Sequence, residues 1–279
     1  MNLTNYHSHC SYCDGKAPLE DFIKEAIKQG FNSYGISSHA PLPFQAPWSM
    51  NWEQVPDYLE ECNSLKEKYA SQIELYIGME IDYLNEESNP SVSRFKELRL
   101  DYSIGSVHLL YDQNNEVVDV DCSTDKFGVI IDKYFKGDIL HVIHSYYDRL
   151  KKMIELGGFD IVGHADKIHY NASLYRPGLL EESWYNDLMF DYFSLIADKG
   201  YIVEINTKAF FQLGTFFPNK KYFSLLKELN IPVQVNSDAH FPQKINDGRF
   251  EAFQALKEVG YTTVMELHAG KWEECEIID

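Results

Sequence analysis

The chain has 279 residues, of which 44% are hydrophobic, and this is enough to bury one large core. Its 43 acidic side chains outnumber its 25 basic ones and give a net charge of −18 at pH 7, which disfavours polynucleotide partners. No apolar run reaches the roughly 18 residues of a membrane-spanning helix, and we expect the first residues to form a strand rather than a charged and apolar secretory leader. We therefore expect one cytoplasmic domain over residues 1–279, with no membrane or nucleic-acid partner and an oligomeric state that stays open.

Strand-like and helix-like runs alternate along the chain. An opening strand with His7 and His9 is followed by six more strands, expected at residues 32–38, 73–78, 101–107, 159–163, 201–205 and 231–235, and by a candidate eighth strand at 261–266. Apolar spacing predicts helices at residues 18–29, 54–70, 92–98, 125–156, 181–199, 220–229 and 248–259. This order predicts a parallel β/α architecture. No glycine-rich nucleotide-binding motif follows a strand, which favours a closed barrel over a nucleotide-binding sheet.

The opening strand carries a pair of metal-ligand candidates. Alternate residues of a strand share a face, so His7 and His9 should point the same way, about 7 Å apart. All six later strands end in a histidine, a carboxylate or an asparagine. Because a barrel brings the carboxyl ends of its strands to one rim, these residues should form one site.

Two other groups of residues give weaker signals. Five cysteines include only one C-x-x-C, at Cys10 and Cys13, which disfavours disulfides and a four-cysteine zinc site. The histidines His141 and His144 are three residues apart in a predicted helix but lack an H-E-x-x-H context. We expect both groups to have structural positions.

Six short motifs occur in a fixed order over nearly the whole chain. They are H-S-H with D-G five residues later, S-H-A-P, G-M-E-I-D, G-S-V-H, G-H-A-D and S-D-A-H. The ordered set resembles the polymerase and histidinol phosphatase (PHP) superfamily. The Y-H-S-H opening and the segment I-V-E-I-N-T at 202–207 are most similar to its histidinol-phosphatase branch. This resemblance implies an α/β fold of the PHP type, a distorted TIM-like (β/α)7 barrel, with three clustered metals.

The family pattern implies which residues hold the metals. One metal would take His7, His9, Glu80 and Asp238. A second would share Glu80 and add His108 and His164. The third would take Asp14, His39 and His240, with Asp14 in a place that is a histidine in some relatives. The resemblance also implies catalytic roles for Glu80, Asp238 and His240. Three poorer matches to phosphate-contacting positions are Tyr111, Arg176 and Lys208.

The residue chemistry agrees with this pattern. Mixed imidazole and carboxylate ligands suit zinc, iron or manganese, whereas magnesium and calcium prefer oxygen alone. A carboxylate such as Glu80 can bridge two ions, and paired ions stabilise the displacement at a phosphate ester, with a bridging hydroxide as the nucleophile. We therefore expect three divalent ions and no covalent phosphoenzyme.

The expected function is a metal-dependent phosphomonoesterase that hydrolyses L-histidinol phosphate to L-histidinol and phosphate in histidine biosynthesis. We expect the substrate amine to lie near carboxylates at the rim, among Asp82, Asp166 and Glu204. One alternative is a PHP phosphoesterase that acts on a nucleotide, an oligonucleotide end or phosphotyrosine. The other is a non-catalytic barrel module, which the complete set of nine ligand candidates disfavours.

Overall fold

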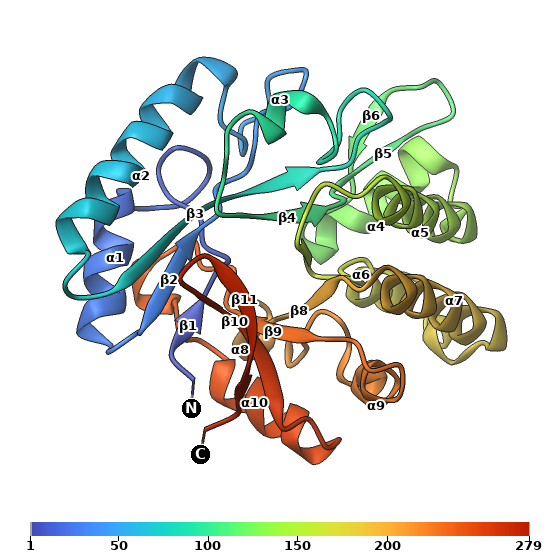
Figure 1. Cartoon of the computed structure of the whole chain (residues 1–279). Coiled ribbons are helices and arrows are strands. Elements are labelled where there is room, and N and C mark those ends of the chain that lie inside the picture. The colour runs from blue at the N-terminus through green and yellow to red at the C-terminus, as the bar shows by residue number, and fades with distance from the viewer. Residues whose placement is uncertain (1, 279) are drawn as a thin grey trace.

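The computed structural model describes residues 2–278, and its centre is a seven-stranded parallel sheet (Figure 1). The strands lie in the order β1 (Thr4–Asn5), β2 (Ser33–Ile36), β3 (Glu74–Asp82), β4 (Tyr102–Ser106), β7 (Ile161–Val162), β8 (Ile202–Asn206) and β9 (Val233–Asn236). A parallel bridge between Ser8 and Ala239 joins the segments that follow the two edge strands. The sheet is therefore a nearly closed barrel, which confirms the predicted (β/α)7 fold.

Helices surround the barrel, with α1 and α2 on one side and α4 to α7 on the other (Figure 1). The helices are α1 (Leu19–Lys28), α2 (Val55–Tyr69), α3 (Ser93–Lys96), α4 (Thr124–Phe135), α5 (Ile139–Leu156), α6 (His169–Tyr175), α7 (Ser183–Lys199), α8 (Phe210–Leu213), α9 (Phe223–Glu228) and α10 (Arg249–Glu258). Each of the longer helices buries one apolar face; α1, for example, buries Leu19, Phe22 and Ile23. Among residues 2–278, no helix is both long and apolar enough to cross a membrane.

The single helix expected over residues 125–156 is wrong. The chain forms α4 and α5 instead, separated by residues 136–138, of which Lys136 and Gly137 have φ angles of 54° and 77°. Two successive residues in the left-handed region end a helix. Both helices bury apolar side chains on one face, so the apolar spacing continues across the break and gives no sign of it.

The candidate eighth strand does not join the barrel. It is β10 (Thr263–His268), which pairs antiparallel with β11 (Lys271–Glu276). This hairpin covers the amino-terminal end of the barrel, where Leu267 and Trp272 pack against Tyr6, Tyr76 and Tyr102. A second hairpin that the sequence did not predict, β5 (Leu109–Tyr111) with β6 (Val117–Asp119), directly follows His108.

Candidate metal centre

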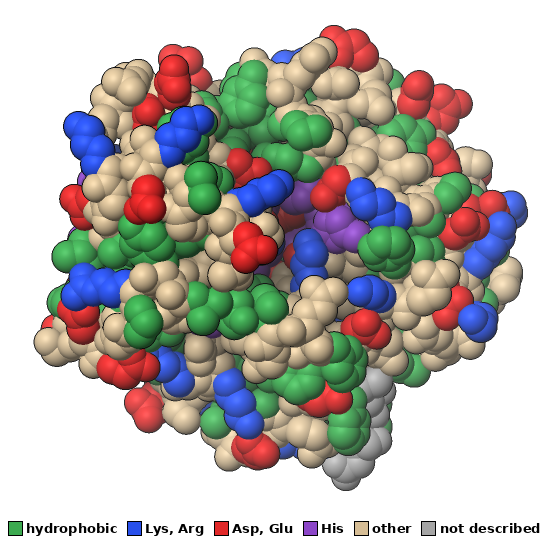
Figure 2. Space-filling model, turned by 180° about the vertical axis from the view of Figure 1, so that it is seen from behind, with side chains coloured by type: hydrophobic (Ala, Val, Ile, Leu, Met, Phe, Trp, Pro, Cys, Tyr) green, Lys and Arg blue, Asp and Glu red, His purple; other side chains and the backbone are tan. Residues whose placement is uncertain are grey.

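The carboxyl ends of the barrel strands surround a polar hollow. Figure 2 shows it in the middle of one face, with histidine side chains inside and acidic and basic side chains around it. The residues that line it are Asp14, His39, Trp48, Glu80, His108, Asp119, Asp121, Lys167, Lys208, Asp238 and His240. The barrel thus brings residues from distant motifs to one place.

His7 and His9 reach the hollow from the segment that closes the barrel. Strand β1 ends at Asn5, but backbone pairing resumes further on, where the His9 N–H donates to the Ala239 carbonyl at 2.9 Å. The two imidazole centroids lie 5.0 Å apart and both side chains are buried. The two histidines therefore lie next to each other, although the regular strand is shorter than predicted.

Glu80, on β3, is the centre of the site. Its carboxylate oxygens lie 2.8–3.5 Å from ring nitrogens of five histidines, which are His7, His9, His39, His108 and His164. The Ser106 hydroxyl also donates to Glu80 Oε1 at 2.6 Å. A buried carboxylate among so many imidazoles is placed to bridge two cations.

Two of the ligand candidates have a strained backbone. His164 follows β7 with a φ of 27°, and Asp238 follows β9 with a φ of 48°. For residues other than glycine, such left-handed conformations cost of order 1–3 kcal/mol and are concentrated at functional sites. In this conformation Asp238 Oδ1 lies 3.1 Å from His9 Nε2, and His164 Nε2 lies 2.8 Å from Glu80 Oε1.

The remaining candidates form the other side of the cluster. Asp14 Oδ2 lies 3.2 Å from His240 Nε2, and Asp14 Oδ1 lies 3.9 Å from His39 Nε2. The His9 ring lies between the other two histidines, with centroid distances of 4.2 Å to His39 and 4.3 Å to His240. All nine sequence-predicted ligands therefore belong to one continuous cluster.

The donor atoms fit metal ions. Three overlapping groups each place their ligand atoms within 4.8 Å of one another, namely His9, Asp14, His39 and His240; His7, His9 and Glu80; and His39, Glu80 and His108. Four buried atoms of these side chains make no well-directed hydrogen bond, and they are His9 Nε2, Asp14 Oδ1, His39 Nδ1 and His164 Nδ1. Leaving such atoms unsatisfied is costly, and cations that accept their lone pairs would remove the cost.

Two buried carboxylates orient the histidines from behind. Glu204 Oε1 lies 2.6 Å from His7 Nδ1, and Asp82 Oδ1 lies 2.9 Å from His108 Nδ1. A proton on each Nδ1 atom, shared with its carboxylate, leaves the Nε2 lone pair free to face the cluster. This carboxylate–histidine arrangement is typical of metal sites.

The family model of the PHP domain matches residues 5–208, which is most of the chain and includes seven of the nine clustered side chains. The chain belongs to the PHP domain family. This confirms the resemblance seen in the six motifs. Asp238 and His240 lie beyond the matched range, but they contact His9 and Asp14 within it.

Several known proteins are similar to this chain over most of their length. The histidinol-phosphatase of Bacillus subtilis is 27% identical over 258 residues, covering 86% of this chain and 94% of that protein. A solved structure assigned as a histidinol phosphatase of Listeria monocytogenes has a TM-score of 0.79 and 25% identity, covering 89% of this chain and 99% of that one. The fold is also shared with histidinol phosphate phosphatase of Lactococcus lactis, solved with zinc, L-histidinol and phosphate; the TM-score is 0.71, the identity is 17%, and the match covers 98% and 99% of the two chains.

The nine clustered side chains interact strongly with one another through their charges. Burial raises the pKa of Glu80, but His39, His7 and His108 outweigh it and hold this pKa well below 4.5. Burial lowers the pKa of His7, but the carboxylates of Glu204 and Glu80 hold it well above 6.5. In the metal-free protein, protons therefore occupy part of the space that cations would take.

Two lysines, Lys167 and Lys208, and two aspartates, Asp119 and Asp121, line the mouth of the polar hollow. Lys208 Nζ lies 3.2 Å from Asp238 Oδ1, and Lys167 Nζ lies 2.6 Å from Asp121 Oδ2. Asp119 contacts no basic side chain among the described ion pairs, and its carboxylate only accepts from the Asp121 N–H. Burial and the neighbouring Asp121 raise the pKa of Asp119 to about 6. The mouth thus offers both positive and negative groups to a substrate.

Sequence reasoning missed Asp119, Asp121 and Lys167, and it left Trp48 unassigned. A signal existed for the aspartates, because the D-V-D spacing at 119–121 places both on one face of an extended chain. Lys167 directly follows the G-H-A-D motif. Trp48 lies in an aromatic loop that could line a pocket mouth, but loop packing explains such aromatics equally well; in the structure its ring packs edge-on against His39 at 4.8 Å.

Five residues expected near the substrate lie elsewhere. Tyr111 faces a different cleft, where Arg149 stacks on its ring, and Arg176 pairs with Glu182 at 2.6 Å. Of the carboxylates expected to receive an amine, Asp82 and Glu204 contact His108 and His7, and Asp166 accepts from the Asn219 N–H and contacts His169. Their buried partners occupy them, so they are not open to a substrate; of the predicted substrate residues only Lys208 lines the pocket.

Proposed function

We propose that this PHP protein is a metal-dependent phosphomonoesterase that hydrolyses L-histidinol phosphate. The observation that carries the proposal is the clustering of five histidines around Glu80, with unsatisfied ligand atoms beside them, at the base of a pocket with a charged mouth. The substrate assignment is supported by the histidinol-phosphatase names of relatives that align over most of their length.

The nine clustered side chains would hold three divalent ions, with Glu80 shared between two of them. Zinc, iron and manganese are the candidates, because each accepts mixed imidazole and carboxylate ligands. When bound, such ions act as Lewis acids on phosphoryl oxygens and make water acidic enough to supply hydroxide near neutral pH. Which ligand serves which ion stays a prediction, since His9 and His39 each belong to two of the overlapping groups.

The surrounding residues would position the substrate. Lys208 lies beside Asp238 and His240, so its ammonium group can contact a phosphoryl oxygen at the edge of the cluster. Lys167 holds Asp121 in place at 2.6 Å. These contacts keep positive charge next to the metals, where the dianionic phosphate would bind.

Asp119 is the best-placed group for the substrate amine. Burial and the charge of Asp121 raise the pKa of this half-buried carboxylate to about 6, and no described ion pair compensates its negative charge. An ammonium group would provide that compensation. The indole of Trp48, which lies 5.6 Å from the His108 ring, forms an apolar wall on which a substrate imidazole could stack.

The test compares the kcat/KM values for L-histidinol phosphate and phenyl phosphate on one zinc-loaded preparation, for the wild type and for Asp119→Asn. We expect a clear preference for L-histidinol phosphate, and Asp119→Asn should reduce this preference about tenfold or more by raising KM. Asp187→Asn, which changes an exposed aspartate on α7 outside the pocket, is the control.

Equal kcat/KM values for both compounds would replace the proposal with a generalist phosphoesterase. A preference for a nucleotide or phosphotyrosine would point to the alternative substrates of the family. The absence of phosphate release from every ester, with metals bound, would support a non-catalytic module.

A further inference from the structure

A second group of metal-ligand side chains lies on the β10–β11 hairpin, at the opposite end of the barrel from the pocket. Glu266, His268 and Cys275 each offer one atom, and these atoms lie within 4.8 Å of one another. Glu266 and His268 are two residues apart on β10, and Cys275 lies on β11 opposite Val264. Because opposite residues and alternate residues share a face of a hairpin, the register places all three side chains on one face.

The three atoms converge on one point. His268 Nε2 lies 3.4 Å from Glu266 Oε2 and 3.3 Å from Cys275 Sγ. In a nucleophilic cysteine–histidine–carboxylate triad, the thiol and the carboxylate contact different ring nitrogens. Here both contact the same nitrogen, and this is the arrangement of atoms around a shared cation.

We infer that the hairpin binds one divalent ion of the zinc class through Glu266 Oε2, His268 Nε2 and Cys275 Sγ. Carboxylate, imidazole and thiolate are all zinc ligands, with bond lengths of about 2.0–2.3 Å. In a tetrahedral site such bonds place neighbouring ligand atoms about 3.3–3.8 Å apart. The observed separations of 3.3 and 3.4 Å match this spacing, and the fourth position is left for water.

A hydrogen-bond network holds the carboxylate in place. Glu266 is 5% exposed, and its Oε1 atom accepts from Asn2 Nδ2 at 2.6 Å, which leaves Oε2 facing His268. Asn2 also donates to the Glu276 carbonyl and accepts from the Ile278 N–H, each at 2.9 Å. Such partners behind a ligand orient it and strengthen metal binding.

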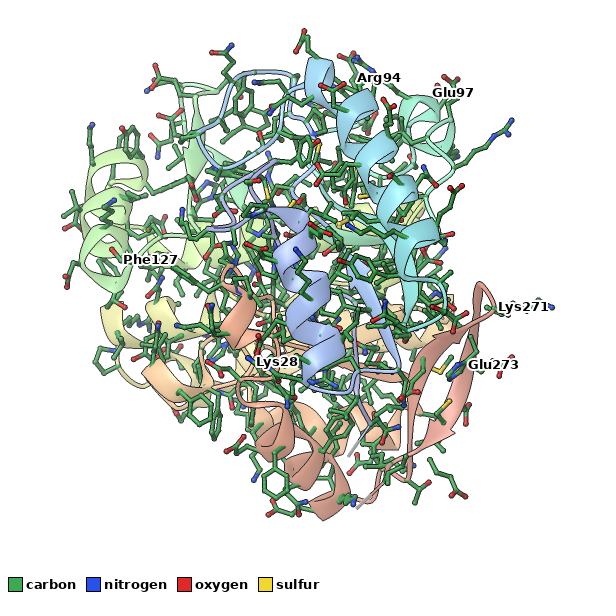
Figure 3. All side chains as sticks on the ribbon, turned by 90° about the vertical axis from the view of Figure 1, so that its left-hand side faces the viewer. Lys28, Arg94, Glu97, Phe127, Lys271 and Glu273 are labelled. Carbon is green, nitrogen blue, oxygen red and sulfur yellow. The ribbon has the colours of Figure 1, made fainter. Side chains whose placement is uncertain are left out.

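An ion can reach this site from solvent. The His268 side chain is 40% exposed, and the outer edge of the hairpin projects from the molecule, as Lys271 and Glu273 show in Figure 3. Leu267, between two of the ligands, donates its N–H to Tyr6 Oη at 2.9 Å. A bound ion would therefore stabilise the packing of the hairpin against the amino-terminal end of the barrel.

Cobalt substitution tests the inference without using activity. A thiolate bound to Co²⁺ gives an intense near-ultraviolet charge-transfer band, and the nine ligands proposed for the pocket contain no sulfur. We expect the wild type loaded with Co²⁺ to show this band and Cys275→Ser to lose it. Cys122→Ser, which changes a half-buried cysteine on another segment, should keep it. Phosphate release should stay the same in all three proteins.

A second variant keeps the test valid if Cys275→Ser does not fold. His268→Asn changes a half-exposed side chain, so it should fold, lose the band and bind one zinc ion fewer per chain than the wild type. Retention of the band in Cys275→Ser, or its loss in Cys13→Ser, whose thiol lies 3.5 Å from His9 Nδ1, would assign the thiolate to the pocket and overturn the inference. The absence of any band in the wild type would overturn it as well.

Discussion

The two ends of the barrel differ in how they satisfy their buried polar groups. We call the amino-terminal end, which the β10–β11 hairpin covers, the closed end, and the carboxyl end, which holds the pocket, the open end. At the closed end, Tyr6 Oη accepts from the Leu267 N–H at 2.9 Å, and Tyr102 Oη donates to the Tyr6 carbonyl at 2.6 Å. At the open end, ligand atoms of His9 and His39 have no hydrogen-bond partner. These groups of the closed end find partners within the protein, whereas the ligand atoms of the open end would be satisfied by cations. Trp272 Nε1 is an exception at the closed end, because it has no hydrogen-bond partner.

Adjacent residues serve the two ends. The Tyr6 ring packs in the aromatic cluster of the closed end, 5.3 Å from Trp272, and the next side chain, His7, contacts Glu80 in the open end. Neighbouring side chains of one short segment therefore belong to different ends of the barrel. Substitutions at the two ends should separate stability from activity.

The largest loss of activity is expected for Glu80→Gln. The amide keeps the shape of the side chain but cannot bridge two cations, and a loss of about 4 kcal/mol of transition-state stabilisation lowers kcat/KM about a thousandfold. Elemental analysis should also show fewer bound ions. Glu273→Gln, a change on the exposed hairpin strand β11, is the control and should keep both values. A fully active, fully metallated Glu80→Gln protein would contradict the central position of Glu80.

An intermediate loss is expected for Asp82→Asn. Asp82 contacts His108 Nδ1 at 2.9 Å and accepts from the His108 N–H at 3.0 Å, so the amide should leave the ring less well oriented. Replacing such a partner typically lowers metal affinity or activity by about 10–100-fold. Titration against a competing chelator measures the affinity. If zinc affinity does not change, the orienting role of Asp82 is wrong.

Metal affinity should rise with pH. Burial lowers the pKa of His108, but Asp82 and Glu80 outweigh it and raise it to about 9, and His7 is also held well above its ordinary value. Each ring must lose a proton before it can bind a cation, so affinity should increase about tenfold per pH unit for each proton displaced, until the pH reaches the raised pKa. Calorimetry in buffers of different ionisation enthalpy measures this proton release. Metal uptake without proton release at pH 7.5 would show that these rings are already neutral.

The raised pKa of His108 has the opposite effect on the stability of the metal-free protein, which should fall as the pH rises. A raised histidine pKa stabilises the fold fully below about pH 6.5, the ordinary value, and this contribution is lost as the pH rises through about 9. The Tm of the metal-free protein should therefore fall over this range. The Tm of the zinc-loaded protein should not follow it, because bound metal replaces the protons.

The smallest effect on activity is expected for Trp272→Ala at the closed end. Loss of its half-buried ring and its edge contact with Tyr6 should lower the free energy of unfolding by about 2 kcal/mol. The kcat value should stay within about twofold of the wild type, since the ring lies at the far end from the pocket. Chemical denaturation and phosphate release measure the two quantities. A large drop in kcat with unchanged stability would show that the two ends are not separable.

The ligand residues of the open end could be predicted well because their spacing and order along the chain are visible in the sequence. Short apolar strands that each end in a ligand require a common rim in a barrel, so Glu80 and His164 could be placed together from positions 84 residues apart. The PHP motifs then supplied the grouping of ligands, which strand periodicity alone could not give. The structure adds that His9 and His39 are shared between neighbouring groups.

Features that depend on backbone conformation or tertiary pairing could not be predicted from apolar spacing. The left-handed break at Lys136 falls within a continuous amphipathic pattern, and β10 reads like a barrel strand although it pairs with β11. The pocket mouth was missed for a similar reason. Asp119 reaches it on an antiparallel hairpin that interrupts the β/α alternation, whereas Arg176 and Tyr111 were placed by weak motif similarity and lie elsewhere.

The most direct test of the account is to locate zinc by anomalous diffraction in crystals of protein whose phosphate release from L-histidinol phosphate has been measured. The account predicts three anomalous peaks around Glu80, each within bonding distance of the clustered histidines and carboxylates, and loss of activity when a chelator removes them. An active preparation with no anomalous peak near Glu80 would contradict the claim that this cluster is the metal centre that hydrolyses the substrate.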